Sequence, residues 1–162
     1  MNDLDSSFSV IDKIFKKFDE TRSYAELDNS MIRFNSEIVE LKSVDDVDRI
    51  IAELNCIPRK MFMYGMILES QSQVLQKLED EFELWKAKKL HEIDKSKFKS
   101  EKAKDDFVKV EFEEEYKAYT NQLSTEQYNL GIMKRVVSAL ESYSFKLHSI
   151  LTYKQKILEK TH

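Results

Sequence analysis

Lysine is the residue type whose spacing in this chain points most clearly to a chemistry. Between Lys86 and Lys104 there are eight lysines and three acidic residues, whereas the segments on either side of this stretch are net acidic. Lysine ammonium groups attract phosphates, and binding of this kind weakens as salt rises. Phe98, inside the stretch, is suited to stacking on an unpaired base. The candidate nucleic-acid-binding residues are Lys86, Lys88, Lys89, Lys95, Lys97, Phe98, Lys99, Lys102 and Lys104. The alternative is that these lysines form a solvated face that pairs with nearby acids along the helices.

Residues suited to catalysis lack the spacing that catalysis needs. The three histidines, His91, His148 and His162, form no pair with metal-ligand spacing. Adjacent carboxylates, as at Asp105 and Asp106, adjoin expected helix starts, where acids complement the helix dipole. There is no glycine-rich nucleotide loop and no nucleophile elbow, and the single cysteine, Cys56, is expected to be a buried structural thiol. We therefore expect no enzyme activity, no metal and no cofactor.

Composition predicts the fold class. The chain has 162 residues, of which 41% are hydrophobic and only two are glycine and one proline. Tight turns and β-hairpins need more of these two residues, so an all-α fold is expected. No apolar run reaches the roughly 18 residues that span a bilayer, and the first residues are acidic. We expect a cytoplasmic protein, in the host cytoplasm if it is phage-encoded, with no membrane partner.

Apolar periodicity predicts short helices followed by two long ones. The first short helix covers about 7–20, the second runs through Met31 to Leu41, and a third ends before Pro58. A long helix over about 59–94, a lysine-rich connector over 95–104, and a second long helix from Phe112 follow. The predicted organisation is an acidic helical N-terminal region, 1–57, and a long antiparallel hairpin, 58–162, within what is most simply one domain.

The hairpin has a predictable register. If the chain reverses near residue 100, positions whose numbers add to about 200 face each other, which brings Gly65 and Gly131 to nearly the same level. A helical glycine costs about 1 kcal/mol relative to alanine, so this coincidence predicts a close approach of the two backbones.

The last helix carries a second apolar row that one hairpin partner cannot cover. Either the N-terminal helices or another subunit must bury it, because large apolar patches are rarely left bare. We favour self-association through this helix. The expected interface residues are Ile132, Val136, Tyr143, Leu147, Ile150, Leu151 and Ile157.

The segment Leu84-Trp85-Lys86-Ala87-Lys88-Lys89-Leu90, at the end of the first long helix, resembles the basic-Ala-basic pattern of UvsY-like phage recombination mediators. The order of features over about 58–158 is also similar to that family. The resemblance implies that Lys86 and Lys88 contact single-stranded DNA. It further implies that helical subunits assemble into a ring through their C-terminal region, and that they help load a RecA-like recombinase onto DNA coated by single-strand-binding protein.

Several features depart from that family pattern. The connector is longer and richer in lysine, Leu90-His91-Glu92 replaces aromatic residues, and residues 1–55 form an acidic extension. The leading hypothesis is a non-enzymatic single-stranded-DNA-binding recombination mediator that forms homo-oligomers. The alternative is a helical structural or adaptor protein that binds another protein and has no nucleic-acid role. A third, weaker hypothesis is an inhibitor whose acidic faces mimic nucleic acid.

Overall fold

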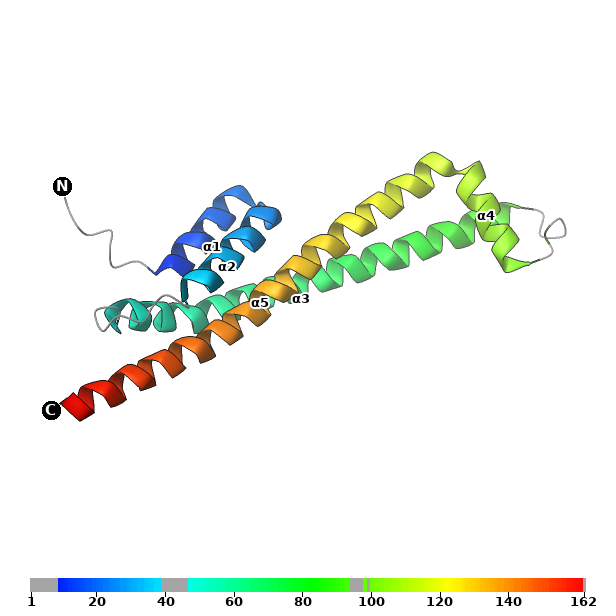
Figure 1. The fold of residues 1–162 in the computed structure, drawn as a ribbon. Helices are drawn as coiled ribbons and strands as arrows, with labels where there is room; N and C mark the ends of the chain where they lie inside the picture. Colours follow the sequence, from blue (N-terminus) through cyan, green and yellow to red (C-terminus); the bar gives the residue numbers. More distant parts are fainter. Residues whose placement is uncertain (1–8, 39–46, 94–97, 99, 162) are drawn as a thin grey trace. The chain divides into compact units, whose positions relative to one another are not determined.

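The fold is all-helical, as the composition predicts. The computed structural model describes residues 9–38, 47–93, 98 and 100–161, and within these ranges it has no strand. None of the described helices combines the length and apolarity that crossing a membrane requires. The helices, labelled in Figure 1, are α1 (Val10–Thr21), α2 (Tyr24–Ile38), α3 (Val47–Glu92), α4 (Glu101–Glu111) and α5 (Glu113–Thr161).

The helices contribute to two compact units. The first, which we call the N/C unit, comprises Met1–Leu68 with Gly131–His162, and the second, the middle unit, comprises Glu69–Leu130. Both α3 and α5 belong in part to each unit. In the middle unit α3 and α5 run antiparallel: Phe82 contacts the rings of Tyr116 and Tyr119, and Trp85 contacts Phe112. These residue numbers add to about 200, so the expected hairpin register is confirmed there.

The core of the N/C unit is formed by α1 and α2 packing on the first part of α3 and the last part of α5. The rings of Phe15 and Tyr64 lie 4.1 Å apart between centroids, which joins α1 to α3. Phe34 meets Tyr143 edge-on at 5.4 Å, and the Tyr143 hydroxyl donates to the main-chain carbonyl of Met31 at 2.7 Å, which joins α2 to α5. Burial raises the pKa of Tyr143, so this hydroxyl remains a donor at neutral pH.

A buried carboxylate from α3 holds the start of α1. The main-chain N–H groups of Val10 and Ile11 donate to the Glu53 carboxylate at 2.5 and 3.1 Å, and the Ser9 hydroxyl donates to it at 2.5 Å. Ser9 is also the N-cap, since its oxygen accepts from the N–H of Asp12. The first N–H groups of a helix have no intrahelical partner, and the helix dipole favours negative charge at this end. Glu53, although fully buried, is thereby supplied with donors.

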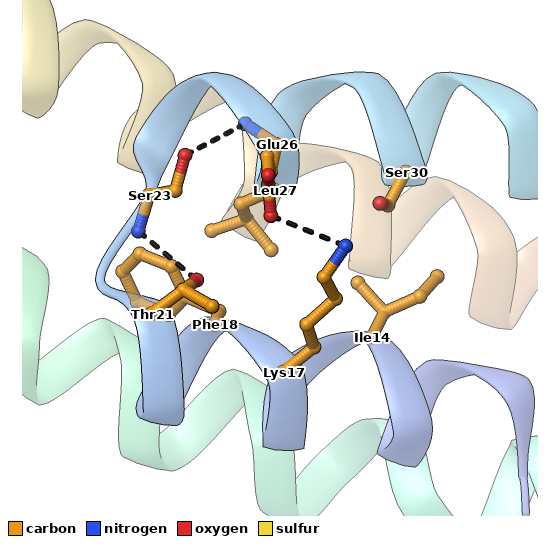
Figure 2. Close-up of a pocket in the computed structure, with 8 residues that line it drawn as sticks. All are labelled: Ile14, Lys17, Phe18, Thr21, Ser23, Glu26, Leu27 and Ser30. Carbon is orange, nitrogen blue, oxygen red and sulfur yellow. Dashed lines mark hydrogen bonds and ion pairs between the residues drawn. The ribbon is translucent and has the colours of Figure 1, made fainter.

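The turn between α1 and α2 is closed by local polar contacts, which Figure 2 shows. Arg22 ends α1 in the left-handed conformation (φ 52°), and its N–H donates to the carbonyl of Phe18 at 2.7 Å. The Ser23 hydroxyl accepts from the N–H of Glu26, whose carboxylate pairs with Lys17 at 3.2 Å. The cavity that this turn encloses has a volume of about 10 Å³, room for one water molecule and no ligand.

The helix end that was expected before Pro58 is wrong. Helix α3 is continuous from Val47 to Glu92 with Pro58 inside it. Proline removes one main-chain donor, yet Ile50, Ile57 and Tyr64 recur every seven residues through this region and all are fully buried. The apolar row thus stays in phase across the proline, and packing on the core stabilises the helix on both sides of it.

The second apolar row of the C-terminal helix is covered by the chain itself. Ile132, Val136, Tyr143 and Leu147 are buried in the core that α5 shares with α1, α2 and the first part of α3, and Ile150 and Leu151 pack at the edge of the same core. Of the seven expected interface residues, Ile157 alone is exposed, at 39%. The expectation of a free interface is corrected here: the N-terminal helices take the place that we assigned to another subunit.

The expected close approach at the two glycines is also wrong. A Cβ atom added to Gly65 would meet nothing within 4 Å, and one added to Gly131 would meet only the Arg135 side chain of its own helix at 3.9 Å. Neither glycine is needed to admit a neighbouring backbone.

Replacing Glu53 with glutamine tests the cap of α1. Glu53→Gln keeps the shape but puts an amide N–H among donors, so we expect the free energy of unfolding to fall by about 2 kcal/mol in urea denaturation. The exposed glutamate Glu69 on the same helix supplies the control, and Glu69→Gln should leave the midpoint nearly unchanged. Equal midpoints for the two variants would contradict the cap.

Replacing Gly65 with alanine tests the open space at this position. Because nothing lies within 4 Å, Gly65→Ala should stabilise the protein by about 0.5–1 kcal/mol through helix propensity alone. The reverse change at an exposed site of the same helix, Ala87→Gly, should destabilise it by a similar amount. Thermal or urea unfolding gives both values. A destabilised Gly65→Ala variant would mean that a neighbour does approach this backbone.

Candidate nucleic-acid interface

The stretch from Lys86 to Lys104, which we call the basic segment, has all its described lysines in the middle unit. Lys86, Lys88 and Lys89 are on the last turns of α3, and Lys102 and Lys104 are on the first turn of α4. Ser100 caps α4, its side-chain oxygen accepting from the N–H of Ala103, so part of the expected connector is helical. Three more candidates, Lys95, Lys97 and Lys99, lie outside the described residues.

Two of the three lysines at the end of α3 are held by neighbouring side chains. Lys86 pairs with Glu83 and lies 4.8 Å above the ring of Phe82. Lys89 lies 3.8 Å from Glu115 on α5 and 4.2 Å above the ring of Phe112. About a fifth of each lysine side chain is exposed (21% and 20%), so both have contacts that a ligand must share or displace.

The α4 side of the segment shows the same division between held and exposed groups. Lys104 pairs with Glu101 at 2.5 Å, and the half-buried ring of Phe98 packs on Phe107 with centroids 5.1 Å apart. Lys88 and Lys102, in contrast, are exposed. Among the described candidates, these two ammonium groups are the ones most open to an incoming phosphate.

Beside these lysines lies a cluster of aromatic rings from α3, α5 and the residue between α4 and α5. Phe82 stacks on Trp85 at 5.8 Å and on Tyr119 at 5.3 Å, and the indole N–H of Trp85 donates to Glu115 at 2.7 Å. Trp85 is half-buried, as are the other rings except Phe82, which is buried. The cluster comprises Phe82, Trp85, Phe112, Tyr116 and Tyr119.

Sequence reasoning missed a further lysine beside this cluster. Lys109, at the end of α4, lies 5.6 Å above the ring of Tyr116. Together with Tyr116 it lines an open groove of about 360 Å³ at the junction of α4 and α5. The expected connector ends at Lys104 and no separate helix is expected over 105–111, so Lys109 is not among the candidate residues. The seven-residue spacing of Lys109 and Tyr116 is the signal that was available.

The histidines and the cysteine of the described residues belong to no metal-binding group. The described part of the chain contains no group of three or more His, Cys, Asp or Glu side chains that could hold a metal ion. His91 and His148 are exposed on different units. Cys56 is half-buried, and burial raises the pKa of its thiol, which disfavours the reactive thiolate.

Comparisons with family models, curated proteins and solved structures find no match to this chain. The resemblance to UvsY-like mediators accordingly rests on the residues quoted for it, Leu84 to Leu90, and on the order of features along the chain.

Proposed function

We propose that this protein is a non-enzymatic binder of single-stranded nucleic acid and that the middle unit makes the contact. The observation that carries the proposal is the aromatic cluster, in which every ring except Phe82 is half-exposed and a lysine ammonium group lies above each of Phe82, Phe112 and Tyr116. Proteins that bind single strands combine aromatic rings, on which bases stack, with cations that follow the backbone. Exposed Lys88 and Lys102 extend the positive charge beyond the rings.

The ion pairs of the middle unit determine which lysines are available to a phosphate first. Lys86, Lys89 and Lys104 each have a glutamate partner in the free protein. The glutamate of each pair is largely in water (55–84% exposed), and ion pairs with a solvated partner contribute about 1 kcal/mol or less, so a phosphate can replace the carboxylate at small cost. We therefore assign the first electrostatic contact to Lys88 and Lys102, and a secondary one to the paired lysines.

A finer role follows from the resemblance alone. In a UvsY-like mediator the bound strand is DNA, and the protein helps a RecA-like recombinase replace single-strand-binding protein on it. We propose that role for this chain, with Lys88 as the more exposed of the two lysines that match the family pattern.

The first test is fluorescence anisotropy with labelled single-stranded and duplex oligonucleotides over a salt series. The double variant Lys88→Gln, Lys102→Gln should bind a single strand about tenfold more weakly at moderate salt. The slope of log K against log salt should fall by about 1.4, because roughly 0.7 counterions are released per contact with a single strand.

The control for this test removes the same charge elsewhere. Lys77 and Lys134 are exposed, one in each unit and both outside the basic segment, and Lys77→Gln, Lys134→Gln should change the affinity little. No binding by the wild type at low salt would remove the nucleic-acid proposal and leave the adaptor. Binding to a basic protein, without binding to DNA, would favour nucleic-acid mimicry.

Apolar side chains on the outer faces of the N/C unit favour a contact with another protein chain, which is either the partner of the adaptor alternative or a second copy of this chain. Phe62 and Met66 on α3 are 71% and 61% exposed, and Phe145 on α5 is 76% exposed. Phe145 and Tyr153 also line an open groove of about 380 Å³ on α5. Because the resemblance implies assembly through the C-terminal region, a second copy of this chain is the occupant that we propose for this α5 surface.

Sedimentation velocity over a range of protein concentrations tests this self-association. Phe145→Glu should shift the wild-type oligomer to monomer, because a carboxylate in a dry contact is strongly disfavoured. The same change at Tyr128, an exposed aromatic residue of α5 in the middle unit, is the matched control and should leave the oligomer intact. A wild type that is monomeric at every concentration would contradict the proposal.

A further inference from the structure

The groove at the α4–α5 junction lies outside the basic segment that the sequence singled out. Helix α4 ends at Glu111, Phe112 leaves the helical conformation (φ −116°, ψ 42°), and α5 begins at Glu113. The N–H of Tyr116 donates to the carbonyl of Phe112 at 2.9 Å, which fixes the first turn of α5 against this bend. The groove is lined by Lys109, Val110, Glu113, Tyr116, Lys117 and Thr120.

Packing on one side holds the ring of Tyr116 in this groove. The ring meets Phe82 edge-on at 5.3 Å and Trp85 at 6.3 Å, so its orientation is set by the aromatic cluster. Tyr116 nevertheless remains half-exposed and forms part of the groove lining. A ring held in this way loses little freedom when a ligand stacks on it, which favours binding.

The charge of the groove favours an anionic ligand. Lys109 and Lys117 are both exposed, and Glu113 is the one acidic residue of the lining. Lys117 donates a hydrogen bond to Glu113, which lowers the pKa of that carboxyl. At neutral pH the lining therefore has a net positive charge, with Lys109 placed directly above the ring. Val110, which is 77% exposed, adds an apolar edge.

We propose that this groove takes one unpaired base of a nucleic-acid strand, stacked on Tyr116, with the adjoining phosphates at Lys109 and Lys117. The proposal rests on the proposed function and adds a subsite to it. The volume of about 360 Å³ is near the lower end for small-molecule sites and suits a single nucleotide. A duplex keeps its bases stacked on each other and offers none to the ring, so the groove provides a physical reason for preferring single strands.

Two variants and a modified strand test the subsite. Lys109→Gln, Lys117→Gln removes the two cations from exposed positions, and Tyr116→Leu removes the ring. Binding is measured by anisotropy with a labelled single strand and with the same strand made abasic, which keeps the phosphates and lacks the bases. Circular dichroism and the melting temperature confirm that each variant is folded, with Lys77→Gln, Lys134→Gln again as the charge-matched control.

We expect the double lysine variant to lose about fivefold or more in affinity for both strands. The affinity of Tyr116→Leu for the normal strand should fall at least about fivefold, whereas its affinity for the abasic strand should change little. Only the normal strand has bases that can stack on the ring. If the wild type binds neither strand, the proposed function itself fails. Two results would overturn the subsite while the proposed function stands. One is a double lysine variant that binds as tightly as a wild type that does bind; the other is a Tyr116→Leu variant whose affinity for the normal strand and for the abasic strand falls by the same factor.

Discussion

The Glu53 carboxylate is the contact on which the N/C unit depends. It lies on α3, is fully buried, and accepts hydrogen bonds from the first N–H groups of α1 and from the Ser9 hydroxyl. Burying an unpaired carboxylate costs free energy, and so does burying the unpaired N–H groups at a helix start. The hydrogen bonds between these two sets of groups offset both costs. This contact fixes where α1 begins. The hairpin of α1 and α2 can then cover the apolar row of α5, with Phe34 packed on Tyr143.

The two units differ in how they use aromatic residues. In the N/C unit Phe15, Phe34 and Tyr64 are buried with apolar neighbours, and the tyrosine hydroxyls are satisfied by Asp19 and by a main-chain carbonyl. In the middle unit most of the rings are half-exposed and have lysine ammonium groups above them. The first arrangement gives stability and the second leaves rings and charge accessible. For this reason the binding proposal belongs to the middle unit.

Periodicity predicted much of this fold, and it failed where neighbours in space decide the outcome. The all-α class and the hairpin register near residue 100 followed from composition and the apolar stripe, and Phe82 with Tyr119 confirms the register. The helix end at Pro58 was predicted from local propensity, but buried Ile57 and Tyr64 stabilise the helix through it. The apolar row of α5 was visible in the sequence, but its cover by α1 and α2 was not. An apolar row shows that some helix must pack on it, and does not show whether that helix belongs to the same chain or to another copy. In the candidate site, the lysines were found by counting, but the pair that Lys89 forms with Glu115 on the other long helix was not.

Some of the hydrogen bonds that dock the N-terminal helices onto the long ones join a side chain of a long helix to a main-chain group of α1 or α2. Glu53 accepts from the main-chain N–H groups of Val10 and Ile11, and Tyr143 donates to the main-chain carbonyl of Met31. Every residue except proline has a main-chain N–H, and every residue has a main-chain carbonyl, so apart from excluding proline at positions 10 and 11 these bonds place no demand on the identity of residues 10, 11 and 31 beyond what packing requires. Over evolutionary time the docked helices are then free to exchange apolar side chains of suitable size, while Glu53 and Tyr143, which supply the side-chain half of each bond, are constrained.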